Sequence, residues 1–174
     1  GGVKAALLLN VEPGADTALD GQALAKAEMV VTLSPFKTNL DISDVLLPIA
    51  PFSETSGSFV NAEGRLQSFH AVVKPLGETR PAWKVLRVLG NLLGLGGFAQ
   101  ESSQDVLAQA LPKIAHGEFV SAARLSNRTS AAIDTATAAT KPCVASIYQL
   151  DALVRRAGSL QLTADALAAS EVSA

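Results

Sequence analysis

The chain has very few side chains of the kinds that bind metal ions. Its 174 residues include a single cysteine, Cys143, and two histidines, His70 and His116. A lone cysteine cannot form an internal disulfide, and iron–sulfur clusters and structural zinc sites need several thiolate or imidazole ligands. Neither histidine has carboxylates or cysteines spaced around it as metal-binding or catalytic companions. The sequence therefore predicts no metal site and no catalytic residue in this chain.

Charged residues and long hydrophobic runs are also scarce. Charged side chains make up 17% of the sequence, and the formal net charge is -2. No run of lysines and arginines is long enough to release counterions from a nucleic acid, so we expect no nucleic-acid partner. The longest apolar stretch, residues 85–95, is interrupted by Arg87 and Asn91 and is shorter than the roughly 20 residues needed to cross a bilayer. We therefore expect no direct membrane insertion.

Short motifs for phosphate binding and nucleophilic catalysis are missing as well. The sequence contains no Gly-x-Ser-x-Gly elbow, no Gly-x-x-x-x-Gly-Lys loop and no Gly-x-Gly-x-x-Gly after its first apolar run. The glycine cluster Leu93-Gly-Leu-Gly-Gly97 follows a predicted helix, and a helix stop explains it best. Position 1 is glycine, not an initiator methionine. We expect the chain to be a piece of a longer protein.

Apolar residues, by contrast, are plentiful at 48%, enough for one domain. Short apolar runs at residues 5–9, 29–33 and 45–47 predict three parallel strands, the first two buried on both faces. Apolar residues at helical spacing between positions 19 and 27 predict a helix between the first two strands. This order predicts an α/β fold with a partial doubly wound parallel sheet.

The next part of the chain is predicted to combine irregular loops with helices. Prolines and glycines recur through residues 48–64 and interrupt regular secondary structure there, and short extended pieces are predicted at 58–60 and 66–73. A helix is predicted at 83–93, where Trp83 heads the apolar stripe and is expected to be buried. A second helix is predicted from Ser103 to the residue before Pro112. We expect a fold that turns from sheet to helix.

The C-terminal part has a low-complexity composition. Serine, threonine and alanine dominate residues 126–140, which predicts a surface linker, whereas residues 144–154 are again apolar. Residues 164–174 are rich in alanine and serine and are predicted to be a frayed tail. The chain is therefore divided into an α/β portion, residues 1–98, and a helical and irregular extension, residues 99–174.

Three blocks of sequence carry a recognisable pattern. They are Asp44-Val-Leu-Leu-Pro48, then Glu54-Thr-Ser-Gly57-Ser-Phe-Val-Asn61-Ala-Glu63-Gly64-Arg65-Leu-Gln67, then Pro75-Leu-Gly77-Glu78-Thr-Arg80-Pro-Ala-Trp83. Residues 3–95 thereby resemble the molybdopterin oxidoreductases, and the third block is most similar to the large iron–sulfur subunit of bacterial NADH:quinone oxidoreductase (respiratory complex I). The departures from the pattern, Ser43, Ser58 and Thr79, replace small residues by small residues. Asp151-Ala-Leu-Val-Arg155-Arg156 also resembles the end of that subunit.

The resemblance implies a structural and assembly role. Iron–sulfur clusters held upstream in the subunit would carry electrons from NADH towards quinone, and this region would scaffold the peripheral arm without a cofactor of its own. The implied partners are other peripheral-arm subunits. The implied location is the cytoplasmic face of the bacterial inner membrane. The alternative is a C-terminal fragment of a catalytic molybdopterin enzyme such as a formate dehydrogenase.

The two alternatives assign different roles to the second block. Asn61, Arg65 and Gln67 have planar polar groups able to bond a pterin edge or a phosphate, and in the catalytic relatives this region lies near the pterin. The structural interpretation pairs Arg65 with Glu54, Glu63 or loop backbone. For the arginine pair at 155–156, contact with an acidic neighbouring subunit is one reading and a solvated pair is the favoured one.

Overall fold

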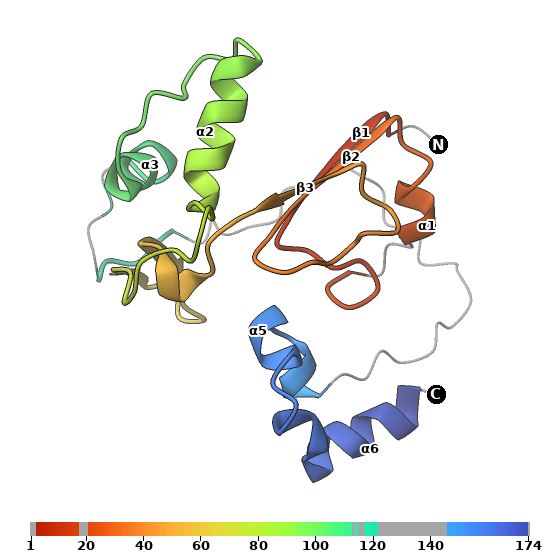
Figure 1. Ribbon diagram of the computed structural model, residues 1–174. Helices are drawn as coiled ribbons and strands as arrows, with labels where there is room; N and C mark the ends of the chain where they lie inside the picture. The colour runs from red at the N-terminus through yellow and green to blue at the C-terminus, as the bar shows by residue number, and fades with distance from the viewer. Residues whose placement is uncertain (1–2, 18–20, 113, 115–116, 122–145, 174) are drawn as a thin grey trace, which may run out of the picture.

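Three parallel strands form the main sheet of the protein. The computed structural model describes residues 3–17, 21–112, 114, 117–121 and 146–173. The strands are β1 (Ala5–Leu9), β2 (Met29–Ser34) and β3 (Val45–Pro48), in the order β1-β2-β3, and the short helix α1 (Gly21–Leu24) lies between β1 and β2 in the chain. Figure 1 shows the sheet at one side of the molecule, with the helices α2 and α3 on the other. The predicted α/β class is confirmed.

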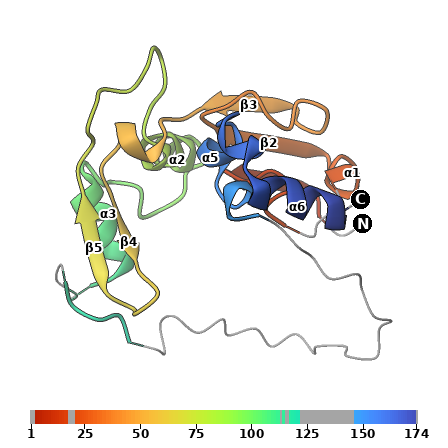
Figure 2. The same ribbon diagram turned by 90° about the horizontal axis from the view of Figure 1, so that it is seen from below.

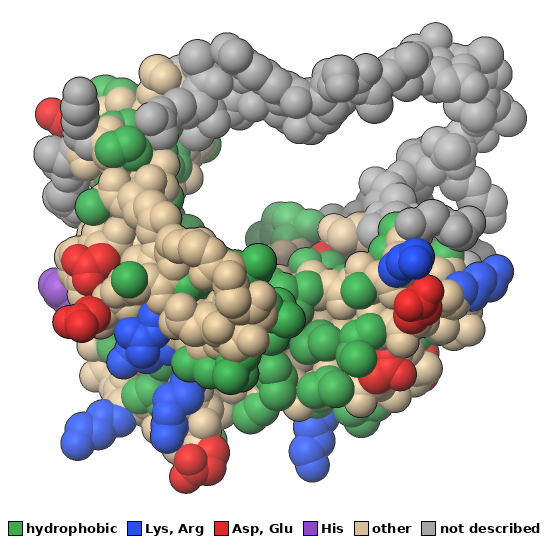
Figure 3. Space-filling view, turned by 90° about the horizontal axis from the view of Figure 1, so that it is seen from above, with side chains coloured by type: hydrophobic (Ala, Val, Ile, Leu, Met, Phe, Trp, Pro, Cys, Tyr) green, Lys and Arg blue, Asp and Glu red, His purple; other side chains and the backbone are tan. Residues whose placement is uncertain are grey.

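The strands differ in how deeply they are buried. β2 is central, and its Val30, Thr32 and Leu33 are at most 1% exposed. The prediction that β1 is buried on both faces is wrong, because Leu7 and Leu9 are 47% and 41% exposed. β1 is an edge strand, and in the described part of the chain little covers the face that bears these leucines. Figure 3 shows a face of the molecule on which hydrophobic side chains form a broad surface area.

Polar side chains hold the segment between β2 and β3 against the sheet. The Asp44 carboxylate accepts a hydrogen bond from the backbone N–H of Val30 at 2.7 Å, and the hydroxyls of Thr32 and Ser43 are 2.7 Å apart. Asn39 adopts a φ of 56° and donates from Nδ2 to the carbonyl of Val11 at 2.8 Å. A buried hydroxyl such as that of Thr32 is tolerated because it has a partner. The aspartate of the first sequence block therefore has a structural role.

A hairpin follows the parallel sheet, after a short 3₁₀ helix η1 (Phe52–Glu54). Its strands are β4 (Gly57–Val60) and β5 (Leu66–Phe69), paired antiparallel. Gly57 lies against the ring of Phe69, where a Cβ would approach Cζ to 2.9 Å, and Gly64 has a φ of 85° in the turn. Both positions require glycine. The predicted extended pieces are confirmed as this hairpin.

Two helices follow the hairpin, on the opposite side of the molecule from α1 (Figure 1). α2 (Ala82–Leu92) ends before Gly94, which has a φ of 68°, and the predicted helix stop is confirmed. α3 (Ser103–Ala110) begins with a capping box between Ser102 and Asp105. Hydrogen bonds from the backbone N–H of Glu101 and then from Ser102 hold the pKa of the Asp105 carboxyl below its usual value.

The C-terminal segment, residues 146–173, forms short helices. They are η2 (Ile147–Gln149), α5 (Ala152–Arg155), η3 (Leu160–Leu162) and α6 (Ala164–Ser173). The prediction of a frayed tail is wrong for α6, since alanine has the highest helix propensity and the Ser146 hydroxyl donates to Asp165 at 2.8 Å. Figure 2 shows α5 and α6 in front of the parallel sheet. The linker predicted at 126–140 lies outside the described residues.

A search of the described helices for a membrane-crossing segment found none that is sufficiently long and apolar.

Candidate functional site

The carboxyl ends of the three parallel strands form one rim of a cavity. This carboxyl edge is the place where open α/β sheets bind ligands, because the loops that leave the strands separate there. Asn10, which follows β1, has a φ of 51° and donates its backbone N–H to the carbonyl of Leu33 at 2.8 Å. The next strands continue into Phe36 and Ile49, which also reach the cavity. This edge is therefore the candidate functional site.

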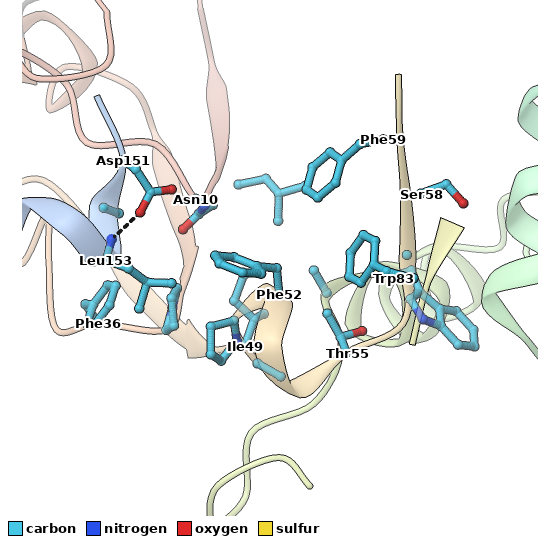
Figure 4. Close-up of a pocket in the computed structure, with 18 of the residues that line it drawn as sticks. Asn10, Phe36, Ile49, Phe52, Thr55, Ser58, Phe59, Trp83, Asp151 and Leu153 are labelled. Carbon is cyan, nitrogen blue, oxygen red and sulfur yellow. Dashed lines mark hydrogen bonds between the residues drawn. The ribbon is translucent and has the colours of Figure 1, made fainter. Parts of the chain in front are cut away.

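The cavity has a volume of about 570 Å³ and is mainly apolar. Figure 4 shows Phe52 near its centre, with Phe36, Asp151 and Leu153 on one side and Ser58 and Trp83 on the other. Its walls come from the carboxyl edge, from η1 and the hairpin, from α2 and from α5: Leu9, Asn10, Pro35, Phe36, Ile49, Ala50, Pro51, Phe52, Thr55, Gly57, Ser58, Phe59, Phe69, Ala82, Trp83, Leu86, Asp151, Ala152 and Leu153.

Asp151 is the only carboxylate among the lining residues, and it is already engaged. It is the N-cap of α5, and its Oδ1 accepts the backbone N–H groups of Leu153 at 2.8 Å and Val154 at 3.1 Å. Figure 4 shows the bond to Leu153 as a dashed line. A carboxylate committed to a helix cap is poorly placed to exchange protons with a ligand. The cavity thus offers shape and apolar surface more than acid–base chemistry.

Two arginines at the end of α5 bind the loop that follows β1 at the carboxyl edge. Arg155 Nη1 lies 3.1 Å from Glu12 Oε2, and its Nη2 bonds to Asp16 Oδ1. Arg156 Nη1 lies 2.8 Å from Glu12 Oε1, and the Arg156 guanidinium carbon is 4.1 Å from the centre of the Phe36 ring. The favoured prediction of a solvated arginine pair is wrong, since the Arg155 side chain is 12% exposed.

The charge of Arg155 is stabilised by this surrounding. Burial lowers the pKa of its guanidinium, but the hydrogen bond and charge of Asp16, followed by the charge of Glu12, outweigh burial and raise it. Nη1 is buried, and no described group accepts a hydrogen bond from it, so its 3.1 Å contact with Glu12 is an ion pair without hydrogen-bond geometry. Arginine is suited to such a position because its charge is retained on burial.

Asn61, Arg65 and Gln67, the three residues considered for pterin binding, do not line this cavity. The Asn61 side chain accepts from the backbone N–H groups of Glu63 and Arg65, at 3.1 and 2.9 Å, and so shapes the hairpin turn. Gln67 is exposed on β5 opposite Phe59. The three side chains thus lie on the hairpin and its turn, apart from the residues that line the cavity.

Arg65 is satisfied by the backbone of a distant segment. Its Nη1 donates to the carbonyl of Gly117 at 2.9 Å, and its guanidinium carbon lies 4.5 Å from the centre of the Phe119 ring. Arg65 and Phe119 also form an antiparallel bridge. Among the described ion pairs, neither Glu54 nor Glu63 contacts Arg65, so the carboxylate partners named by the structural interpretation are wrong and its backbone partner is correct.

Trp83 is half-buried, which corrects the prediction of a buried anchor. Its ring lines the cavity at the start of α2, and the ammonium of Lys84 lies 5.4 Å from the ring centre. The apolar stripe of α2 is real, but the cavity beside the ring leaves part of it accessible. Sequence periodicity shows which face of a helix is apolar and not how completely it is covered.

Potential metal ligands do not gather into a metal site in the described part of the chain. No cluster of three or more histidine, cysteine, aspartate or glutamate side chains occurs there. His70 is exposed, whereas His116 and Cys143 lie outside the described residues.

Glu12 and Asp16 are the site residues that the sequence reasoning missed. A usable signal exists, since two carboxylates follow directly after a predicted strand and therefore belong to the carboxyl edge. Their partner Arg155 is 139 positions from Asp16 along the chain, and no local pattern links such distant residues.

Comparison with known proteins identifies a family and several relatives that match part of the chain. A family model described as "Molybdopterin oxidoreductase" matches residues 1–92. "Probable oxidoreductase YjgC" of Bacillus subtilis (strain 168) is 37% identical over 70 residues, which are 40% of this chain and 7% of that protein. A "Putative formate dehydrogenase" of Staphylococcus aureus (strain bovine RF122 / ET3-1) is 33% identical over 93 residues, or 52% of this chain and 10% of that protein. The similarity thus spans a tenth or less of each relative.

Proposed function

The chain belongs to the molybdopterin oxidoreductase family, and from this premise we propose that it is a structural and docking region of a respiratory NADH:quinone oxidoreductase subunit. In this proposal, iron–sulfur clusters held elsewhere in the subunit carry electrons from NADH towards quinone. The present chain contributes no catalytic residue. It stabilises the subunit and presents surfaces to other peripheral-arm subunits at the cytoplasmic face of the bacterial inner membrane.

The closure of the carboxyl edge is the observation that carries this proposal. In a catalytic member of the family, a ligand bound at this edge would need the loops after β1 and β2 to be accessible. Here the loop residues Glu12, Asp16 and Phe36 are engaged by Arg155 and Arg156 of the same chain. A carboxyl edge whose loops are bound by the protein's own C-terminal segment, beside a cavity with one carboxylate that is already used as a helix cap, suits a scaffold better than a cofactor site.

The contacts of Arg65 within the chain support the same proposal. Its hydrogen bond to Gly117 and its stacking on Phe119 account for the side chain without a ligand. The third sequence block and the motif around Asp151 add support through their resemblance to the complex I subunit. The division into residues 1–98 and 99–174 stays a prediction.

A catalytic formate dehydrogenase is the second candidate, and the similarity to putative formate dehydrogenases of Staphylococcus aureus favours it. In that case Asn61, Arg65 and Gln67 would be expected to turn towards a pterin in the full-length protein. Both candidates are oxidoreductases, so their electron donors and metal contents separate them.

Purification of the full-length protein would test the proposal. An affinity-tagged copy would be isolated from bacterial membranes in a mild detergent, and NADH-dependent quinone reduction, formate-dependent dye reduction and metal content would be measured. We expect co-purifying subunits, NADH-dependent activity and iron without stoichiometric molybdenum or tungsten. Formate-dependent activity with stoichiometric molybdenum or tungsten would overturn the proposal in favour of the second candidate.

A further inference from the structure

The C-terminal segment is attached to the rest of the chain mainly by charged side chains. Among its described residues only Ser146 and Ala166 are buried, and the Ser146 hydroxyl bonds within the segment, to Asp165. By contrast, the side chains that join it to the sheet loops are well shielded. Arg155, Glu12 and Asp16 are 12%, 17% and 23% exposed. Ala152 and Leu153, both half-buried at the cavity, add an apolar contact.

The acidic side of this attachment is held in shape by its own turn. Asp16 Oδ2 accepts the backbone N–H of Glu12 at 2.7 Å, which leaves Oδ1 directed to Arg155. Glu12 uses one carboxylate oxygen for Arg155 and the other for Arg156. The Phe36 ring contacts the Arg156 guanidinium from the neighbouring loop. Two carboxylates and an aromatic face thus match two adjacent guanidinium groups in charge and in shape.

We propose that Glu12, Asp16 and Phe36 form a receptor site for a pair of adjacent arginines, occupied by Arg155 and Arg156 of the same chain, and that this pairing reversibly holds α5 as one wall of the cavity whose opposite wall includes Trp83. Arginine is required because its planar guanidinium can contact a carboxylate and an aromatic ring together, which an ammonium cannot do as well. The inference does not depend on the proposed function, since its readouts concern this chain alone.

Reversibility follows from the kind of contact involved. Salt weakens ion pairs, since the screening length falls from about 30 Å at 0.01 M to about 3 Å at 1 M ionic strength, and it weakens partly shielded pairs such as those of Arg155 less than exposed ones, so the effect is expected towards the upper end of this range. Apolar burial is not weakened in this way. A segment held by Arg155 and Arg156 should therefore leave the carboxyl edge as salt increases, while the parallel sheet and the hairpin keep their structure.

The chain carries its own optical reporters of this movement. Trp83 is the sole tryptophan and lines the cavity, and Tyr148 is the sole tyrosine and lies in the C-terminal segment. Energy transfer from Tyr148 to Trp83, and quenching of Trp83 by the neutral quencher acrylamide, would be measured on the full chain across a salt titration. We expect transfer to fall and quenching to rise severalfold with salt, with full recovery on dilution and unchanged far-UV circular dichroism.

Variants separate the arginine pair from general salt effects. Arg155→Gln combined with Arg156→Gln should show high quenching of Trp83 at low salt, whereas the matched control Arg80→Gln, which removes an exposed arginine, should behave like the parent chain. Asp16→Asn removes one of the two carboxylate partners of Arg155, so its effect should be in the same direction as that of Arg155→Gln and smaller, and adding Asp16→Asn to Arg155→Gln should have little further effect.

A synthetic peptide of residues 146–162 tests whether the site formed by Glu12, Asp16 and Phe36 binds the arginine pair when the pair is supplied from outside the chain. Added to the Arg155→Gln, Arg156→Gln variant, it should restore low quenching of Trp83, and a peptide with lysines at 155 and 156 should bind severalfold more weakly. Quenching independent of salt and of both arginines would overturn the proposal. A salt-sensitive change that follows dimer formation in size-exclusion chromatography would also overturn it, since the arginines would then come from a second copy.

Discussion

Replacing Arg65 with alanine gives the sharpest test of how the hairpin is held. The substitution removes the hydrogen bond from Nη1 to the carbonyl of Gly117 and the stacking of the guanidinium on the Phe119 ring. The backbone contacts between β5 and this segment, such as the bond from the N–H of Leu66 to the carbonyl of Glu118, remain. The loss should therefore destabilise the hairpin without removing the segment altogether.

The magnitude follows from these two contacts. A hydrogen bond involving a charged group contributes about 1.5 to 3 kcal/mol, and a cation–π contact at an accessible position about 0.5 to 1 kcal/mol. Arg65 is only half-buried, so the lower ends of both ranges apply. We expect Arg65→Ala to lower the free energy of unfolding by about 2 kcal/mol.

Urea unfolding followed by far-UV circular dichroism would measure this change. Arg80→Ala is the matched control, because the Arg80 side chain is 56% exposed and pairs with a 94% exposed Glu78; its effect should stay within about 0.5 kcal/mol. Arg65→Lys should fall between the two, since it keeps the charge but not the planar group. Loss of less than about 0.5 kcal/mol in Arg65→Ala, combined with binding of molybdopterin guanine dinucleotide by the parent chain, would refute the structural role.

Three further predictions concern the helices and the cavity. Gly90→Ala should cost about 1 to 3 kcal/mol in chemical unfolding because the new Cβ would lie 2.5 Å from Cγ of Phe98, whereas the control Gly96→Ala meets nothing within 4 Å and should be nearly neutral. Trp83→Ala should cost about 2 kcal/mol, less than the roughly 3 to 5 kcal/mol of a fully buried aromatic residue, and a loss in that higher range would show deeper burial. The lowered pKa of Asp105 means that its helix cap contributes fully above the ordinary carboxyl pKa of about 3.9 and is lost as pH falls through the lower folded value. Amide exchange in α3 should therefore increase at acidic pH in the parent chain, and a pH response equally large in Asp105→Asn would contradict this assignment.

Local features of the sequence determined the elements of secondary structure. Apolar runs predicted β1, β2 and β3, because a short run of branched and aliphatic side chains fits a pleated, covered surface. Proline and glycine between residues 48 and 64 predicted an irregular region with short extended pieces, which the structure pairs as a hairpin, and Gly94 predicted the end of α2. These signals act over a few residues, so they can be interpreted without knowing the rest of the fold.

Tertiary structure decided burial and the pairing of side chains. The exposure of Leu7 depends on which elements cover β1, and this information lies outside β1 itself. Arg65 donates a hydrogen bond to Gly117, which lies 52 positions away along the chain. Arg155 donates one to Asp16, which lies 139 positions away. The sequence shows the charge and the hydrogen-bonding groups of each side chain. These indicate the type of partner that a side chain needs, but not where in the chain that partner lies. Only the folded chain brings Arg155 and Arg156 to the carboxyl edge of the sheet, because a contact between distant residues depends on the packing of everything between them.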